Sequence, residues 1–149
     1  MKYINVLAAS LAILLSFASH AALAADAGKK HHDAGKKHHV VFHITDSDPA
    51  KWNQVLNNAS NLQKNIGKDN IEIEVVANGP GLDMFKLESV AGSRMTDALK
   101  NGISMMACGT TMKAMNVTDQ DLFPGVTVVP GGVIEIMQKE EAGWSYLKI

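Results

Sequence analysis

The chain alternates short apolar or β-branched runs with stretches in which apolar residues recur every three or four positions. The runs have the length and composition of strands, and the stretches between them have the periodicity of helices with one apolar face. This alternation is typical of α/β folds. The sequence therefore predicts a three-layer α/β/α sandwich around a mostly parallel, five-stranded sheet. The predicted strands are residues 40–45, 71–77, 103–107, 126–129 and 144–149.

The pattern of polar and apolar residues predicts the position of two strands in the sheet and the buried side of one helix. Residues 71–77 alternate apolar with acidic side chains, which favours a strand with one wet face near a sheet edge. Residues 103–107 are continuously apolar, which favours a central strand. The helix after the fourth strand is expected to turn Val133, Ile136 and Met137 toward the sheet.

The first 24 residues have the features of a signal peptide. Lys2 precedes an apolar stretch from Val6 to Phe17, which is too short to span a bilayer comfortably. Ala22-Leu23-Ala24 is a small-residue cleavage signal, so cleavage is predicted after Ala24. We expect an exported periplasmic protein that is not inserted in the membrane once the signal is removed.

Residues 25–39 contain the sequence Asp-Ala-Gly-Lys-Lys-His-His twice in succession. They have almost no apolar bulk and are predicted to form a disordered arm ahead of a domain at 40–149. Neutral imidazoles suit Cu, Zn and Ni, so the arm is a candidate metal site, the alternative being a solvated spacer. The candidate ligands are His31, His32, His38 and His39.

The predicted domain is acidic, with nine Lys or Arg against thirteen Asp or Glu in residues 40–149. This balance gives no support for binding nucleic acid. No paired carboxylates suited to hydrolysis are apparent, and no cofactor is required by any motif. The chain has one cysteine, which excludes an internal disulfide and a dithiol cycle.

That cysteine, Cys108, directly follows the third predicted strand and precedes Gly109 and a short predicted helix. A helix N-terminus stabilises a thiolate, the reactive form of cysteine, so Cys108 is the candidate catalytic residue. The alternative is a small buried hydrophobic side chain. His43 lies within a predicted strand and is expected to be a packed or surface residue, so a Cys-His hydrolase is not favoured. Strand alternation places Met106 but not Met105 on the face of the thiol, which favours core packing over copper binding.

Loops after parallel strands share one edge of the sheet. The loop after the second strand should therefore lie beside the thiol, and its glycines leave room for a ligand to approach. The predicted substrate pocket consists of Asn78, Gly79, Gly81, Gly109 and Thr110.

Four segments of the domain resemble the DsrE/DsrF-like family in its small exported branch: EVVANGPGL (74–82), ACGTTM (107–112), DLFPGVTVVPGGV (121–133) and EEAGWSYL (140–147). The resemblance implies an α/β/α fold like that of YchN and a trimeric or hexameric homo-oligomer. It also implies a cysteine that carries sulfur as a persulfide in a sulfur relay, at the position of Cys108.

The leading hypothesis is a periplasmic sulfur carrier that exchanges sulfur with a donor or acceptor protein through Cys108, with transfer chemistry at most. One alternative is a Cu- or Zn-binding module that uses the His-rich arm. The other is a non-catalytic oligomeric interaction protein with an inert cysteine.

Overall fold

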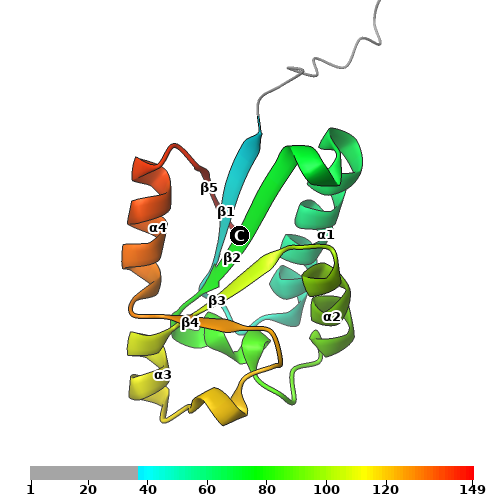
Figure 1. The fold of residues 1–149 in the computed structure, drawn as a ribbon. Helices are drawn as coiled ribbons and strands as arrows, with labels where there is room; N and C mark the ends of the chain where they lie inside the picture. The colour runs from blue at the N-terminus through cyan, green and yellow to red at the C-terminus, as the bar shows by residue number, and fades with distance from the viewer. Residues whose placement is uncertain (1–36) are drawn as a thin grey trace, which may run out of the picture. The chain divides into compact units, whose positions relative to one another are not determined.

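A computed structural model describes residues 37–149, which contain one five-stranded sheet flanked by helices (Figure 1). The strand order is β4-β3-β2-β1-β5, and every neighbouring pair is parallel. The predicted α/β fold and parallel sheet are therefore confirmed. The strands are β1 (His38–Ile44), β2 (Ile71–Ala77), β3 (Ser104–Cys108), β4 (Thr127–Val129) and β5 (Ser145–Lys148).

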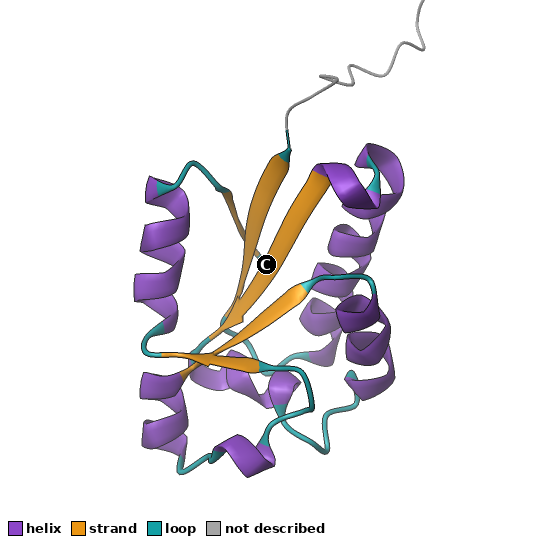
Figure 2. Cartoon of the chain, in the orientation of Figure 1, coloured by secondary structure: helices purple, strands orange, loops and turns teal. Residues whose placement is uncertain are grey.

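The helices form layers on the two faces of the sheet (Figure 2). The helices α1 and α2 cover one face, and α4 covers the other. The short helix α3 follows β3 directly and lies below the start of α4 in Figure 1. The helices are α1 (Pro49–Ile66), α2 (Gly92–Lys100), α3 (Gly109–Met115) and α4 (Gly132–Glu141), with 3-10 turns η1 (Lys68–Asn70), η2 (Gly79–Phe85) and η3 (Asp119–Asp121). Within residues 37–149, no helix is both long and apolar enough to cross a bilayer.

The bounds of α1 follow from local sequence. Asp48 caps the helix, because its carboxylate accepts a hydrogen bond from the Ala50 N–H at 2.8 Å. Pro49 occupies the first turn, where no intrahelical donor is needed. Gly67 ends the helix with φ of 99°, a conformation that favours glycine.

The two faces of the sheet have different interiors. The face under α1 and α2 is packed with the larger apolar cluster, which includes Phe42, Val75 and Met105. The face under α4 holds a small cluster of Val41, Val76 and Ile136, with Met106 and Trp144 packed against it. Met105 and Met106 thus lie on opposite faces, as strand alternation predicts.

The prediction that residues 71–77 lie near a sheet edge is wrong, because β2 is the middle strand of the sheet. Its acidic alternation does not indicate a wet face along the whole strand. Glu72 is exposed, but Glu74 is only 2% exposed and lies beneath α4. The carboxylate of Glu74 is satisfied there by Lys139 of α4, whose Nζ lies 2.8 Å from Oε2.

The orientation predicted for α4 is correct for Ile136 but wrong for Val133 and Met137. Ile136 is buried, whereas Val133 is 65% exposed and Met137 is 50% exposed. The reason is the close packing of Gly132 against the sheet. Because Gly132 faces the sheet, the residues one and two turns later, Ile136 and Lys139, face it as well.

The sheet begins two residues earlier than predicted. His38 and His39 pair with Ile71 and Glu72 in the first two positions of β1. The end of the predicted disordered arm therefore belongs to a strand, since backbone pairing with β2 does not depend on apolar side chains. The signal peptide, the rest of the arm and the ligand candidates His31 and His32 lie outside the described residues.

Candidate functional site

The ends of β1, β2 and β3 meet at one edge of the sheet because the strands are parallel. Ala77 pairs with Ala107, so the next residues, Asn78 and Cys108, are neighbours at the ends of adjacent strands. The N–H of Asn78 also donates to the Ile44 carbonyl at 3.1 Å, which joins the loop after β2 to the end of β1. The predicted juxtaposition of the thiol and this loop is what the register of the sheet produces.

Cys108 is the last residue of β3 and the N-cap of α3, and it is 5% exposed. Its Sγ accepts a hydrogen bond from the Thr111 N–H at 3.5 Å. The first residue of α4 approaches from the other side, where a β-carbon placed on Gly132 would lie 3.2 Å from Cys108 Cβ. The thiol therefore lies where the first turns of α3 and α4 converge.

The surroundings of the thiol favour its ionised form. Burial raises the pKa of the Cys108 thiol, whereas hydrogen bonds lower it, and their combined effect places the pKa below its ordinary value. The Thr111 hydroxyl lowers the pKa most, followed by the backbone N–H groups of Gly132, Thr111 and Thr110. Cys108 thus combines low exposure with an enriched thiolate.

Thr111 links the thiol to the loop after β2. Its Oγ1 accepts a hydrogen bond from the Gly79 N–H at 3.0 Å, which leaves the hydroxyl hydrogen available for the thiolate. Sequence reasoning placed Thr110 rather than Thr111 in the site. The Thr110 hydroxyl instead donates to the Pro130 carbonyl at 3.1 Å. The sequence does contain a signal for Thr111. In a helix the backbone N–H of the third residue after the N-cap points back to the N-cap side chain, and Thr111 is the third residue after Cys108.

Replacing Thr111 with valine should raise the pKa of the Cys108 thiol, because the hydroxyl that lowers this pKa most is lost. At a fixed pH near neutral, a smaller thiolate fraction should slow alkylation by iodoacetamide severalfold. The pH dependence of the alkylation rate measures this shift. Thr111→Ser keeps the hydroxyl and should retain the wild-type profile, and a wild-type profile in the valine variant would contradict the assignment.

The glycines of the predicted pocket lie near the thiol, but two of them accommodate the protein's own backbone. A β-carbon on Gly81 would lie 2.4 Å from the Ile44 carbonyl oxygen. One on Gly109 would lie 3.0 Å from the Val129 carbonyl oxygen. Only Gly79 has open space around the position of a β-carbon. The missing side chains at Gly81 and Gly109 thus serve close packing rather than the approach of a ligand.

His43 lies closer to the site than its place within a strand suggested. Its Nε2 lies 2.9 Å from Asn78 Oδ1, and its Nδ1 lies 2.9 Å from the Tyr146 hydroxyl of β5. His43 was predicted to be a packed or surface residue; it is half-buried, and one of its partners is a residue of the loop beside the thiol. The sequence gives no sign of this contact, because 35 positions separate His43 from Asn78.

The two histidines of the arm that the structure describes, His38 and His39, are not placed together as metal ligands. His38 and His39 are consecutive in β1, so their side chains point to opposite faces of the sheet. His39 lies with its ring centroid 5.2 Å from that of Trp144, and its Nε2 is 3.7 Å from Glu72. Among residues 37–149, no group of three His, Cys, Asp or Glu side chains is arranged to hold a metal ion.

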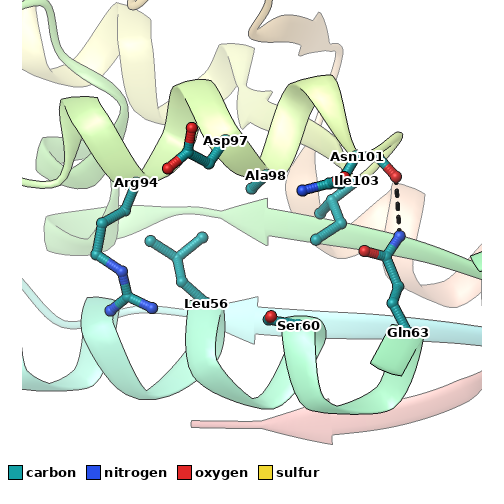
Figure 3. Close-up of a pocket in the computed structure, with 8 residues that line it drawn as sticks. All are labelled: Leu56, Ser60, Gln63, Arg94, Asp97, Ala98, Asn101 and Ile103. Carbon is teal, nitrogen blue, oxygen red and sulfur yellow. Dashed lines mark hydrogen bonds between the residues drawn. The ribbon is translucent and has the colours of Figure 1, made fainter. Parts of the chain in front are cut away.

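Two cavities lie away from the thiol. One, of about 170 Å³, lies between α1 and α2 (Figure 3). Beside it the guanidinium of Arg94 donates hydrogen bonds to the side chains of Asn53 and Asn57 in α1. The other, of about 360 Å³, is at the edge where β2 and β3 begin. Neither is lined by Cys108. The first is lined by Leu56, Ser60, Gln63, Arg94, Asp97, Ala98, Asn101 and Ile103.

Comparison with known proteins gives one family and several related folds. The family model described as the DsrE/DsrF-like family matches residues 16–149. A protein of unknown function from Methanobacterium thermoautotrophicum, MTH1491, is similar with a TM-score of 0.73 and 29% identity, over 76% of this chain and 100% of that one. The chain matches no curated protein.

Two further solved structures show the same fold at lower identity. The protein BT1422 of unknown function from Bacteroides thetaiotaomicron has a TM-score of 0.61 and 18% identity, over 74% of this chain and 94% of that one. The YchN protein from E. coli has a TM-score of 0.60 and 12% identity, over 76% of this chain and 99% of that one.

Proposed function

The chain belongs to the DsrE/DsrF-like family, and on that basis we propose that it is a sulfur carrier that holds a sulfur atom on Cys108. The family is associated with sulfur relay. The observation that carries the proposal is the hydrogen bonding that lowers the pKa of the Cys108 thiol despite its burial. A side chain that served only as a small apolar filler would not need several donors directed at its sulfur.

The chemistry requires only exchange between sulfur atoms. In loading, the Cys108 thiolate attacks the outer sulfur of a donor persulfide, a new S–S bond forms at Sγ, and the donor leaves as a thiolate. In delivery, an acceptor thiolate attacks the outer sulfur, the bond to Sγ breaks, and its electron pair stays on Cys108. The hydrogen of the outer sulfur travels with it, so neither an oxidant nor a reductant is consumed. Donors around Sγ favour both steps, because Cys108 is the nucleophile in one and the leaving group in the other.

Mass spectrometry of the intact protein after treatment with inorganic polysulfide tests the proposal. We expect the wild-type chain to gain the mass of one sulfur atom and to lose it again on reduction. Cys108→Ser should gain nothing, because a hydroxyl forms no persulfide. Met106→Leu is the matched control, since it changes a sulfur-containing side chain on the same face of β3 and should load fully. No loading of the wild-type thiol, or loading that persists in Cys108→Ser, would overturn the proposal.

We further propose that the carrier works in the periplasm as a homo-oligomer. The signal-like first 24 residues support the location, and the homo-oligomer is what the family resemblance implies. Exposed apolar side chains on α4, among them Val133 and Met137, are available for such contacts. Fractionation of cells, together with light scattering of the purified chain, tests the location and the assembly separately.

A further inference from the structure

A row of polar side chains crosses the sheet beneath the start of α4. His43 of β1, Asn78 at the end of β2 and Tyr146 of β5 are joined by two hydrogen bonds of 2.9 Å. Their strand positions place all three on the same face as Cys108, because Val76, Met106 and Val41 of the α4-side cluster have the same alternation. The row therefore extends from the exposed edge strand to the neighbour of the thiol.

The chemistry of the three side chains determines which atom donates and which accepts in each of the two hydrogen bonds. The Asn78 Oδ1 can only accept, so the Nε2 of His43 carries a hydrogen and donates it. In the neutral ring Nδ1 then accepts the hydroxyl hydrogen of Tyr146. The amide oxygen of Asn78 is thereby occupied. Within residues 37–149 its Nδ2 group makes no hydrogen bond, and both of its N–H donors are free.

Asn78 and Cys108 contact the same point of α4. A β-carbon on Gly132 would lie 3.3 Å from Asn78 Cβ and 3.2 Å from Cys108 Cβ. The two side chains thus flank the first residue of α4 as immediate neighbours. The donors that lower the pKa of the thiol belong to Thr110, Thr111 and Gly132, and the amide of Asn78 is not among them. Its free N–H donors are therefore available to a group attached to Sγ.

Resting on the proposed function, we infer that the Nδ2 amide of Asn78 binds the outer sulfur of a Cys108 persulfide, and that His43 is its positioning residue. A hydrogen bond to the outer sulfur draws electron density from it and makes it a better electrophile for the acceptor. The Tyr146 hydroxyl donates to Nδ1 of His43 and thereby stabilises the tautomer whose Nε2–H holds the amide. Inner and outer sulfur are then bound by separate groups, so the rate of delivery can be altered without a change in the pKa of the thiol.

Transfer from the loaded protein to cyanide tests this division. The carbon of cyanide attacks the outer sulfur, the S–S bond breaks toward Sγ, the proton of the outer sulfur is released, and thiocyanate forms. We expect Asn78→Ala to slow transfer by about five- to tenfold, the effect of losing one hydrogen bond to a reacting group. Its alkylation profile against pH should stay at the wild-type position, because the donors to Sγ remain.

Substitutions along the row provide the control for a merely structural role. His43→Ala should slow transfer as Asn78→Ala does, and His43→Gln, which can still donate to Asn78 Oδ1, should restore part of the rate. The double variant should be no slower than Asn78→Ala, since His43 acts through Asn78. Thr111→Val should differ from Asn78→Ala by shifting the alkylation profile, because it removes a donor to Sγ.

The outcomes separate this inference from the proposed function. Wild-type transfer by Asn78→Ala overturns the inference and leaves the sulfur carrier intact, provided that Cys108 loads. A shifted alkylation profile in Asn78→Ala also overturns it, because the amide would then act on Sγ. Failure of the wild-type chain to load with polysulfide overturns both.

Discussion

Replacing Lys139 with methionine is expected to lower the free energy of unfolding by about 3 kcal/mol at neutral pH. The substitution keeps most of the apolar stem of the side chain but leaves the carboxylate of Glu74 without its cation. Glu74 is 2% exposed, and its Oε1 has no hydrogen-bond partner even in the wild-type chain. Breaking such a pair is costly because the remaining charge is neither solvated nor compensated.

The loss should depend on pH in a defined direction. Burial raises the pKa of Glu74 above its ordinary value of 4.5, and Lys139 opposes that effect. Without Lys139 the folded state holds a proton on Glu74 still more tightly than the unfolded state does. The unfolded chains titrate alike, so the penalty grows as pH rises above the raised pKa of Glu74 in the wild-type fold and disappears as pH falls below it.

Urea denaturation at a series of pH values measures this dependence. Lys64→Met, at an exposed position of α1, is the matched control and should change stability little at any pH. The double variant with Glu74→Gln should recover most of the loss, since no buried charge remains. An equal loss at pH 5 and pH 7 would mean that packing of Lys139 over the Trp144 ring, 4.2 Å from its centroid, dominates instead.

Replacing Gly81 with alanine is expected to cost about 3 kcal/mol of stability, at the upper end of overpacking substitutions. The added β-carbon would lie 2.4 Å from the oxygen and 2.7 Å from the carbon of the Ile44 carbonyl. That carbonyl cannot move freely, because it accepts the hydrogen bond from the Asn78 N–H. The turn η2 must therefore move away from the end of β1, which also weakens the bond from Gly79 to Thr111.

Gly79→Ala is the control for this prediction, as the two glycines lie in the same turn. Its β-carbon would have no neighbour within 4 Å, so the cost comes only from its φ of 53° and is expected to be about 1 kcal/mol. Thermal or urea denaturation compares the two variants directly. Equal stability of both variants would contradict the close contact at Gly81.

The parts of the fold that sequence reasoning predicted well are those set by neighbours along the chain. The helix from Pro49 to Ile66 has its cap, its first-turn proline and its terminal glycine within its own segment. The bounds of Ile71–Ala77 were also predicted correctly, because apolar character changes sharply at both ends. The shared face of Met106 and Cys108 needed only the two-residue period of a strand.

The errors concern residues whose environment comes from a distant segment. Glu74 marks a wet edge if only β2 is considered, but Lys139 of α4 makes its burial possible in the middle strand. Val133 and Met137 complete an apolar pattern with Ile136, but the close contact of Gly132 with the sheet decides which side of α4 is buried. His43 had no visible role until the sheet placed it against Asn78.

By itself the sequence determined that this chain is an α/β protein whose single cysteine lies between a strand and a helix, because periodicity, caps and turn residues act over a few positions. Only the tertiary structure decided what surrounds that cysteine. The N–H donor of Gly132 comes from the start of α4. The hydrogen-bonded row comes from three other strands, with Tyr146 in β5, His43 in β1 and Asn78 at the end of β2. Their positions relative to the thiol depend on strand order and helix packing, which no local pattern encodes.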